Sequence, residues 1–513
     1  MDERAAIPVT LPHPSPTTSY WQDPPDAELA DFLSSETVPN EVVGTLIIGS
    51  GITGAGVAWN LLQNADKKER IVMLEARQAC SGATGRNGGH TKAASYRSFP
   101  SNVEALGLSG AMKIVRLEYA NIRAVHAFAA EHKIDCESRS CDTVDIIYDQ
   151  AQWDECVSAI QLIQESFTEE GDSEGVARYQ LWGAEEAKEK FLVKGKGVEG
   201  EPVLGAVSYE AGSLSAYKFV IGLLKLCLKA TLEFFTNTPA TKLTKGDGGI
   251  WDVETPRGVV RARRVVLATN GYTGFISNKF QGSIVPLRGQ ITAHRPSSNM
   301  PKSGLETTYS FIYSNGYEYM IPRPQTSPFA GDIIIGGGLV KASNEGVSEF
   351  GTTDDSSLNT EISSYLRKTT TSYFGESWGD DDKEGRIRRE WTGIMGYSAD
   401  GFPFVGTWDG ALLDVYEGFG SDDGASQAKC SCGEKSALHC TCGKAATENA
   451  VTGARCSCRA RPAGSCNCER SATENTTPSG DLCSCGARPA TACTCEKATD
   501  GGLLPTETDF TNA

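Results

Sequence analysis

Continuous apolar runs and helical repeats alternate in the first part of the chain. Thr45–Ile48 is a short apolar run that stops at a glycine cluster, and Ala55–Gln63 follows with apolar residues at helical spacing. Ile71–Leu74 is a second apolar run, and it ends at Glu75. This order predicts a strand, a helix and a second strand, which together form the βαβ unit of an α/β fold.

Further along the chain, the same patterns predict both helices and strands. Helical spacing of apolar residues predicts helices near residues 112–129, 153–163, 216–231 and 358–365. Strands are expected at Ile250–Glu254 and Val265–Ala268, and residues 284–340 are rich in strand pattern, with Ile333–Ile335 as the clearest strand. The segment from Glu75 to about residue 105 is rich in glycine, so we expect it to be irregular.

Composition separates the two ends of the chain from its body. Residues 1–40 are rich in proline and acids, which predicts an extended leader strapped onto the next domain. After Gly420, leucine, isoleucine and valine almost vanish, so the tail cannot bury a hydrophobic core. We therefore expect a leader over residues 1–40, a body over 41–425, a cysteine-rich segment over 426–499 and a flexible end over 500–513.

The charge and the N-terminus restrict the partners and the compartment. A net charge of −17 disfavours a surface for nucleic acid or an anionic membrane, so neither partner is expected. The first residues, MDERAAIPVT, have acids and a proline where the apolar part of a secretion signal would lie. No apolar run approaches the ~18 residues that a membrane span needs. These features predict a cytoplasmic protein whose thiols stay reduced.

The glycine cluster after the first apolar run has the form GxGxxG. A strand precedes it, a helix follows it and a second strand ends in an acid, which makes the motif far more specific than it is alone. Gly49 permits a tight turn, Gly51 lets the backbone approach a pyrophosphate, and Gly54 lets the helix pack closely on the strand. The helix N-terminus offers free N–H groups to phosphates, and Glu75 can accept a hydrogen bond from a ribose hydroxyl. The motif predicts a dinucleotide site; the alternative is a plain strand–turn–helix with Glu75 in solvent.

A second glycine-rich segment, Ser81–Gly89, begins six residues after Glu75. Such a loop can lay backbone N–H groups against a flat ring and a phosphate, which favours FAD over NAD. Together with Glu75-Ala76-Arg77, it resembles the D-amino-acid-oxidase-like family of FAD-dependent oxidoreductases, which includes glycine, sarcosine and gamma-glutamylputrescine oxidases. The resemblance covers about residues 40–420 and continues at Val265–Tyr272, Pro286–Gln290, Gly316–Arg323 and Trp391–Gly406.

The resemblance implies an α/β fold in which a Rossmann-like FAD-binding domain is interleaved with a β-sheet substrate domain. The FAD part would take about residues 41–105, 205–285 and 386–420, and the substrate part about 105–205 and 285–385. FAD would be noncovalent, because Glu390–Ile394, where some relatives carry a flavin-linked cysteine, has none. By resemblance, the residues that line FAD are Gly49, Gly51, Ile52, Thr53, Gly54, Glu75, Ala76, Arg77, Ser81, Gly82, Thr84, Arg86, Asn87, Gly88, Ala240, Thr269, Asn270 and Gly271.

The same resemblance implies oxidation of the C–N bond of an amine or amino acid. Bound flavin would accept a hydride and pass the electrons to oxygen or another acceptor. Arg323 is the candidate for a substrate carboxylate, and Tyr317 and Tyr319 share one side of a strand that would wall the flavin pocket. The open alternative is a sheet face packed on the core, with Arg323 paired to an acid. Tyr416–Gly420 begins a segment that the family continues with Gly-His-Gly-Met, but here Ser421–Gly424 follows.

The tail repeats one cysteine pattern, C-x-C-x7-C-x-C, three times. The chain has 17 cysteines, and the repeats start 26 and 27 residues apart (456 − 430 and 483 − 456). Four thiolates per repeat suit one tetrahedral Zn²⁺ or a share in a Cu(I)–thiolate cluster, and bound metal would supply order that the missing core cannot. The tail resembles metallothionein-like proteins; the alternative is a disulfide scaffold or a disordered thiol-rich segment. The predicted ligands are Cys430, Cys432, Cys440, Cys442, Cys456, Cys458, Cys466, Cys468, Cys483, Cys485, Cys493 and Cys495.

Three functions stay open at this point. The leading one is a FAD-dependent amine or amino-acid oxidoreductase with a metal-binding tail, whose partners are a small-molecule substrate, oxygen or another electron acceptor, and metal ions. The second is a metal-thiolate buffering protein with an inactive flavin domain, because the family's last flavin segment is missing. The third is an NAD-dependent dehydrogenase.

Overall fold

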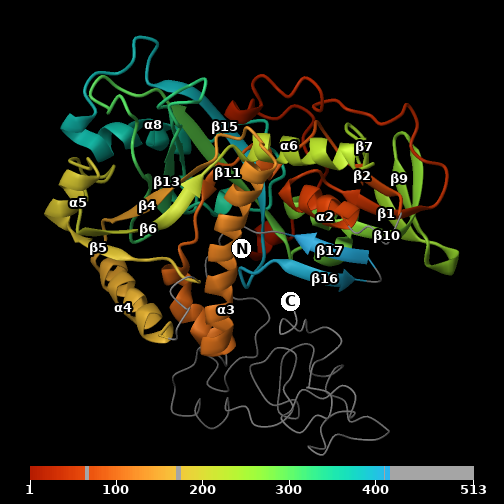
Figure 1. Ribbon diagram of the computed structural model, residues 1–513, viewed down its shortest axis with the longest axis horizontal. Helices are drawn as coiled ribbons and strands as arrows, with labels where there is room; N and C mark the ends of the chain where they lie inside the picture. The colour runs from red at the N-terminus through yellow and green to blue at the C-terminus, as the bar shows by residue number, and fades with distance from the viewer. Residues whose placement is uncertain (64–68, 169–174, 409–410, 416–513) are drawn as a thin grey trace, which may run out of the picture. The chain divides into compact units, whose positions relative to one another are not determined.

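A computed structural model describes residues 1–63, 69–168, 175–408 and 411–415 of the chain (Figure 1). Residues 1–398 and 403–419 form one compact unit, and residues 399–402 group with residues 420–513 in a second. The predicted cysteine repeats and the flexible end lie outside the described residues.

The first sheet contains the predicted βαβ unit. Within the described residues it has eight strands in the order β16-β17-β10-β1-β2-β7, with β9 beside β10 and β8 beside β9. β1 pairs in parallel with β2 and β10, and all six of its residues are buried, as expected for a parallel strand covered on both faces. The strands are β1 (Val43–Ile48), β2 (Ile71–Leu74), β7 (Glu233–Phe235), β8 (Lys242–Lys245), β9 (Trp251–Thr255), β10 (Gly258–Leu267), β16 (Phe404–Trp408) and β17 (Ala411–Val415).

The second sheet is mostly antiparallel and has nine strands in the described part of the chain. Its order is β15-β11-β14-β13-β12-β4-β6-β3, with β5 beside β6, and only the pair β12–β4 on this path is parallel. The strands are β3 (His90–Thr91), β4 (Arg139–Ile147), β5 (Gln180–Gly183), β6 (Gly205–Ser213), β11 (Val285–His294), β12 (Thr308–Ile312), β13 (Tyr317–Pro322), β14 (Ile333–Gly336) and β15 (Ile387–Tyr397).

Three helices begin at residues whose side chains satisfy free N–H groups. Asp149 accepts from the N–H of Gln152 at the start of α4, and Ser215 and Asn359 cap α6 and α8 in the same way. In Figure 1, α6 and α2 lie beside the strands of the first sheet, and they pack on one another. The helices are α1 (Asp2–Ala5), α2 (Ile52–Gln63), α3 (Ser95–Glu131), α4 (Gln150–Ser166), α5 (Ala184–Lys190), α6 (Ala216–Lys229), α7 (Thr273–Ile276) and α8 (Thr360–Phe374).

The α/β fold class is confirmed, and two details differ from the sequence prediction. α3 begins at Ser95, inside the segment expected to be irregular, and it bends at Gly107, where φ is +74°. β6 and β15 belong to the second sheet, whereas residues 205–285 and 386–420 were expected in the FAD part. A strand pattern identifies a strand but not the sheet that it joins, because neighbours in a sheet come from distant parts of the chain.

The two sheets meet across a shared core, and the leader lies against both. One hydrophobic cluster contains residues of α2, α6, β1 and β2 together with Ile291, Ile321 and Trp391 of the second sheet. Leader residues Tyr20 and Trp21 are buried in the same cluster, and Leu33 forms a bridge with Phe235 of β7. The junction between the sheets is therefore the place where all these segments converge.

Candidate functional site

The GxGxxG segment forms a tight turn between β1 and α2 that only glycine permits at two positions. Gly49 has φ +110°, and a Cβ there would lie 2.2 Å from the carbonyl oxygen of Ala268. A Cβ on Gly54 would lie 2.0 Å from the carbonyl oxygen of Gly49, so α2 packs directly on the turn. These contacts match the roles that the sequence predicts for both residues.

The N-terminus of α2 lies open beside an acid and a hydroxyl. The Ile52 N–H donates to Thr84 Oγ1 at 3.0 Å, and the Ile52 side chain is 39% exposed although it is large and apolar. The Glu75 carboxylate accepts from the N–H and the hydroxyl of Ser50, at 3.0 and 2.6 Å. A helix N-terminus of this kind binds phosphate, and Glu75 is within reach of the turn, as a ribose acceptor must be.

The second glycine-rich segment is a loop whose carbonyl groups are fixed by distant side chains. Trp391 Nε1 donates to the carbonyl of Arg86 at 2.7 Å, and Trp21 Nε1 donates to that of Asn87 at 2.6 Å. Ser19 Oγ donates to the carbonyl of Gly85 at 2.7 Å. The leader and β15 thus hold the loop in one conformation.

Two arginines, one before this loop and one within it, share one buried carboxylate. Asp355 is fully buried and accepts hydrogen bonds of 3.0 Å from both Nη atoms of Arg77. Arg86 Nε lies 3.5 Å from the same carboxylate and donates to the carbonyl of Thr392. Burial lowers the pKa of Arg86 to about 10, although Asp355 opposes this shift. The guanidinium groups of both arginines that were predicted to line the cofactor therefore bind protein partners.

Two hydroxyls in the same region have no hydrogen-bond partner. Ser81 Oγ and Tyr272 Oη are buried and unsatisfied among the described residues. Burial raises the pKa of Tyr272, and the charges that act on it include those of Asp355, Arg77 and Arg86. Buried polar groups are nearly always bonded, so these two hydroxyls fit a site that a polar cofactor completes.

Three further predicted FAD residues follow a strand of the first sheet. Thr269, Asn270 and Gly271 come directly after β10, and the Ala268 N–H donates to the carbonyl of Ile48, so they lie beside the end of β1. Asn270 Oδ1 accepts from the N–H of Gly396 at 2.9 Å, which ties this segment to β15.

Three of the other predicted FAD residues have clear surroundings. Ala240 is buried in the core of the first sheet. Gly82 precedes the short 3-10 helix Ala83–Gly85, and Ala76 is half-buried after β2.

The predicted tyrosines share a face of the second sheet that meets the glycine loop. A Cβ added to Gly88 would lie 2.3 Å from Tyr319 Cε2. Tyr317 is on the same side of β13, two residues away, and the Arg97 guanidinium lies 5.3 Å from its ring centre. Burial raises the pKa of both phenols, so both are neutral donors.

Arg323 is paired with an acid, which is the alternative that the sequence left open. It is 5% exposed, and its guanidinium forms an ion pair with Glu137, with Nε 2.6 Å from the carboxylate. It is stacked over the rings of Tyr20 and Trp21, at 5.1 and 4.9 Å from their centres. Arg323 therefore fixes the leader to β13, and its charge is already compensated.

A buried charged cluster on the tyrosine face was not predicted from the sequence. Lys92 Nζ pairs with Asp145 and donates to Ser310 Oγ at 2.6 Å, while the hydroxyls of Tyr96 and Tyr209 each donate to Asp145 at 2.8 Å. Burial opposes ionisation, but the Lys92 ammonium and these hydrogen bonds hold the pKa of Asp145 below its usual value. Strand register puts Asp145 and Ser310 in one row with Tyr319. No sequence pattern indicated Lys92, because its partners are 53 or more positions away along the chain.

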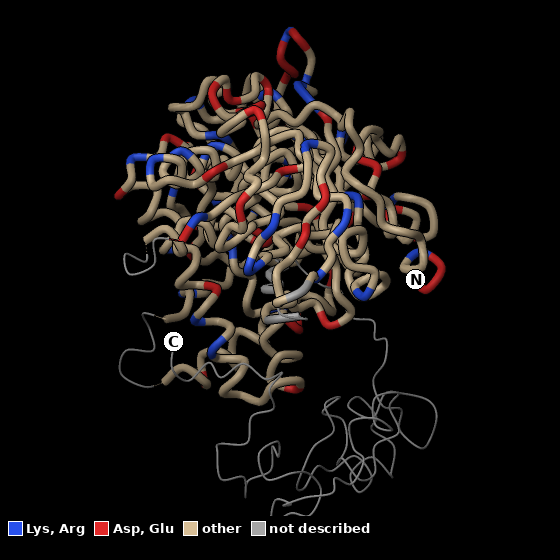
Figure 2. Tube along the Cα trace, turned by 90° about the vertical axis from the view of Figure 1, so that its right-hand side faces the viewer, with Lys and Arg blue, Asp and Glu red and all other residues tan. Residues whose placement is uncertain are grey.

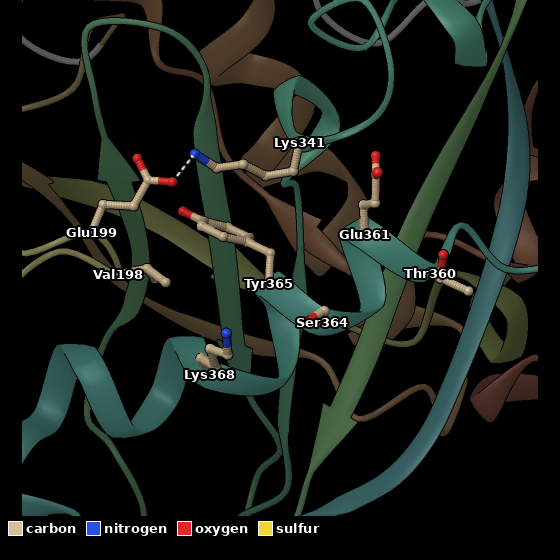
Figure 3. A pocket seen from close by; sticks show the side chains of 8 residues that line it. All are labelled: Val198, Glu199, Lys341, Thr360, Glu361, Ser364, Tyr365 and Lys368. Carbon is tan, nitrogen blue, oxygen red and sulfur yellow. Dashed lines mark hydrogen bonds and ion pairs between the residues drawn. The ribbon is translucent and has the colours of Figure 1, made fainter.

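One cavity in the described part of the chain touches predicted site residues, and another does not. A cavity of about 450 Å³ is lined by Ala76, Arg77 and Pro239 together with part of the leader. Figure 3 shows the other, of about 410 Å³, which lies at the start of α8 and is bordered by the ion pair of Glu199 and Lys341. It contains none of the residues predicted to bind FAD or substrate.

The described residues add three findings, on charge, membrane spans and metal ions. Acidic and basic residues are interspersed over the face seen in Figure 2. Among the residues that the structure describes, no helix is long and apolar enough to cross a membrane. In the same residues, no group of three or more His, Cys, Asp or Glu side chains is arranged to hold a metal ion. The twelve predicted cysteine ligands lie outside them.

Comparison with known proteins identifies two segments. The family described as FAD dependent oxidoreductase (DAO) matches residues 45–423, and a domain of unknown function (DUF7871) matches residues 421–513. The two matches meet where the sequence departs from the flavoprotein pattern.

Two curated relatives are each a "Probable oxidoreductase OrdL". The chain is 22% identical to the one from Haemophilus influenzae over 46% of this chain and 52% of that protein, and 25% identical to the one from Rhizobium meliloti over 44% and 49%. The chain thus spans about half the length of the curated relatives it matches.

Solved structures share the fold at low identity. Glycine oxidase from Geobacillus kaustophilus has a TM-score of 0.55 at 18% identity, covering 73% of this chain and 89% of its own. L-amino acid deaminase from Proteus myxofaciens, in complex with anthranilate, has a TM-score of 0.58 at 15% identity, covering 79% and 90%. L-alpha-glycerophosphate oxidase from Mycoplasma pneumoniae with FAD bound has a TM-score of 0.54 at 14% identity, covering 73% and 89%.

Proposed function

The chain belongs to the family of FAD dependent oxidoreductases described as DAO, and from this premise we propose that it oxidises the C–N bond of a small amine or amino acid to an imine. The observation that carries the proposal is the position of the glycine loop. Through Thr84 the loop touches the dinucleotide turn, and through Gly88 it touches the tyrosine face of the second sheet. A cofactor at the turn and a substrate on that face would be neighbours.

The residues present fit noncovalent FAD. The N-terminus of α2 at Ile52 and Thr53 would take the pyrophosphate, and Glu75 would take a ribose hydroxyl. The unpartnered hydroxyls of Ser81 and Tyr272 supply two further bonds to a polar ligand. When bound, FAD supplies a hydride acceptor and a route for electrons to oxygen or another acceptor.

The tyrosine face would position and protect the substrate. Tyr317 and Tyr319 present flat, half-buried rings beside the glycine loop, which would shield the reacting C–H from water. The Lys92–Asp145 pair is locked by two tyrosine hydroxyls and by Ser310, so it forms a rigid polar floor rather than a free acid or base. Rigid polar groups orient a bound amine without reorganising around it.

Arg97 is a better candidate than Arg323 for the carboxylate of an amino-acid substrate. Arg323 is compensated by Glu137, whereas the Arg97 guanidinium has no acid partner in an ion pair among the described residues. Arg97 is exposed and lies over Tyr317, on the face proposed for the substrate. Arginine binds a carboxylate through two parallel hydrogen bonds, which would orient an amino acid. The similar folds of glycine oxidase and L-amino acid deaminase support this substrate class.

For the tail we propose metal–thiolate binding, on sequence grounds. Three repeats of four cysteines suit Zn²⁺ or Cu(I), and an independently matched domain begins at residue 421.

The test is anaerobic reduction of the purified full chain. We expect bound FAD that denaturation releases, and bleaching of its colour by some members of a panel of amines and amino acids. Arg97→Ala should raise KM for substrates with a carboxylate and leave amines without one unchanged. Arg123→Ala is the matched control, because Arg123 also stacks on a tyrosine, Tyr119, outside the site. Absence of flavin, or flavin that none of the panel reduces, would overturn the proposal.

A further inference from the structure

The cavity of about 450 Å³ lies directly after β2, next to the carboxylate proposed for the ribose. β2 ends at Leu74, Glu75 bonds to the dinucleotide turn, and Ala76 and Arg77 then form one wall of the cavity. Five consecutive leader residues, Thr10–Pro14, also line it. A cavity of this size suits part of a small ligand, and its position beyond Glu75 is that of a nucleoside base attached to the ribose.

We propose that residues Thr10–Pro14, here called the leader strap, form the outer wall of the site for the adenosine half of FAD. This inference rests on the proposed function, since it takes FAD as the cofactor. The leader then belongs to the cofactor site, although it precedes the first strand of the βαβ unit by about thirty residues.

The leader strap is clamped at both ends, and its own bonds are few. Upstream, Gln281 accepts from the Val9 N–H at 3.0 Å and donates to the carbonyl of Ile7 at 2.8 Å. Downstream, the Thr17 N–H donates to the carbonyl of Asp355 at 2.7 Å. Between these clamps, Arg77 donates to the carbonyl of His13 at 3.0 Å, and the hydroxyls of Thr10 and Thr353 lie 2.5 Å apart. The strap therefore spans the cavity as a fixed bridge, held on the cavity side by Arg77.

The composition of the strap suits a flat heterocycle. Leu11, Pro12 and Pro14 give an apolar wall, and the His13 ring adds a second flat surface. The two prolines fix φ and bias the residues before them towards extended conformations, so little entropy is lost when a ligand binds against the strap. Asp354 at the rim is an acceptor that can meet the exocyclic amine of adenine, whereas a phosphate there would be repelled.

The experiment compares FAD with FMN, which lacks the adenylate, on the flavin-free full chain. Leu11→Trp fills the cavity without removing a hydrogen bond of the strap. We expect it to weaken FAD binding by about tenfold or more, measured by quenching of flavin fluorescence, and to leave FMN binding within about twofold of wild type. Thr18→Trp is the matched control, since Thr18 is an exposed leader residue outside the cavity.

Three outcomes separate the strap from the proposed function. If Leu11→Trp and Thr18→Trp bind FAD with equal affinity, the proposed role of the leader strap is wrong, while the assignment as a flavoprotein stands. An equal loss of FAD and FMN in Leu11→Trp also overturns that role, because the effect would then be general. If the wild-type chain binds neither flavin, the proposed function itself is wrong. As a second probe, ADP should raise the melting temperature of wild type but not of Leu11→Trp, and an equal rise in both contradicts the strap.

Discussion

Replacing Asp355 by Asn should destabilise the chain strongly, because one buried carboxylate compensates two buried arginines. The Asp355 side chain is 0% exposed, and those of Arg77 and Arg86 are 9% and 2% exposed. Asn keeps the size and one acceptor oxygen but leaves both guanidinium charges without a counter-charge. Breaking a buried ion pair in this way costs about 3–5 kcal/mol. The carboxylate also connects residues 353–358 to the glycine loop, so the loss should open the cofactor region first.

The assay is urea unfolding of the flavin-free chain, followed by tryptophan fluorescence. Asp23→Asn is the matched control: Asp23 also pairs with an arginine, Arg389, but the two side chains are 46% and 36% exposed. An exposed pair contributes about 0–1 kcal/mol, so the control should unfold close to wild type. If Asp355→Asn shifts the urea midpoint no more than Asp23→Asn does, the buried carboxylate does not carry the stability assigned to it.

Three further predictions concern other parts of the molecule. Burial raises the pKa of Glu318 to about 7 despite the hydrogen bond from Tyr373, so the folded state keeps a proton that the unfolded state loses, and stability should fall as pH rises from about 4.5 to 7. Glu318→Gln should flatten that fall in thermal melts at several pH values, and an unchanged profile would show that another group is responsible. Gly54→Ala puts a Cβ 2.0 Å from a backbone oxygen, which should cost about 1–3 kcal/mol and abolish FAD retention during purification; wild-type retention would contradict the close packing of α2 on the turn. Truncation after Gly424 should remove bound Zn or Cu, measured by elemental analysis, and leave flavin content unchanged; loss of flavin with the tail would mean that the tail completes the cofactor site.

The βαβ unit was predictable because each of its signals is local. Its strands are continuous apolar runs, and Gly54 is required by a contact with Gly49 within the turn. The pairing of Tyr317 with Tyr319 on one face also follows from the two-residue period of a strand. Local pattern therefore gives the elements and the orientation of their side chains.

The partners of charged residues were not predictable, because they come from distant segments. Arg323 meets Glu137 across 186 positions of the chain, and Arg77 meets Asp355 across 278. A sequence pattern gives the charge of Arg323 and its position directly after β13, but whether its guanidinium is free depends on that distant acid. For the same reason no sequence pattern indicated Lys92, and the sequence suggested Arg323 for the role in which we propose Arg97.

The charges around the dinucleotide turn and the glycine loop indicate how these segments would hold a pyrophosphate. Arg77 and Arg86 are positive, Asp355 and Glu75 are negative, and Asp355 lies between the two arginines. The formal charges of these four side chains cancel. None of them is therefore an uncompensated positive charge that could attract the pyrophosphate dianion. What remains is the open N-terminus of α2, with its aligned N–H groups, and the unpartnered hydroxyls of Ser81 and Tyr272. Because these groups act only at contact distance, the geometry of the turn, and not the net charge of the chain, must determine the affinity for FAD.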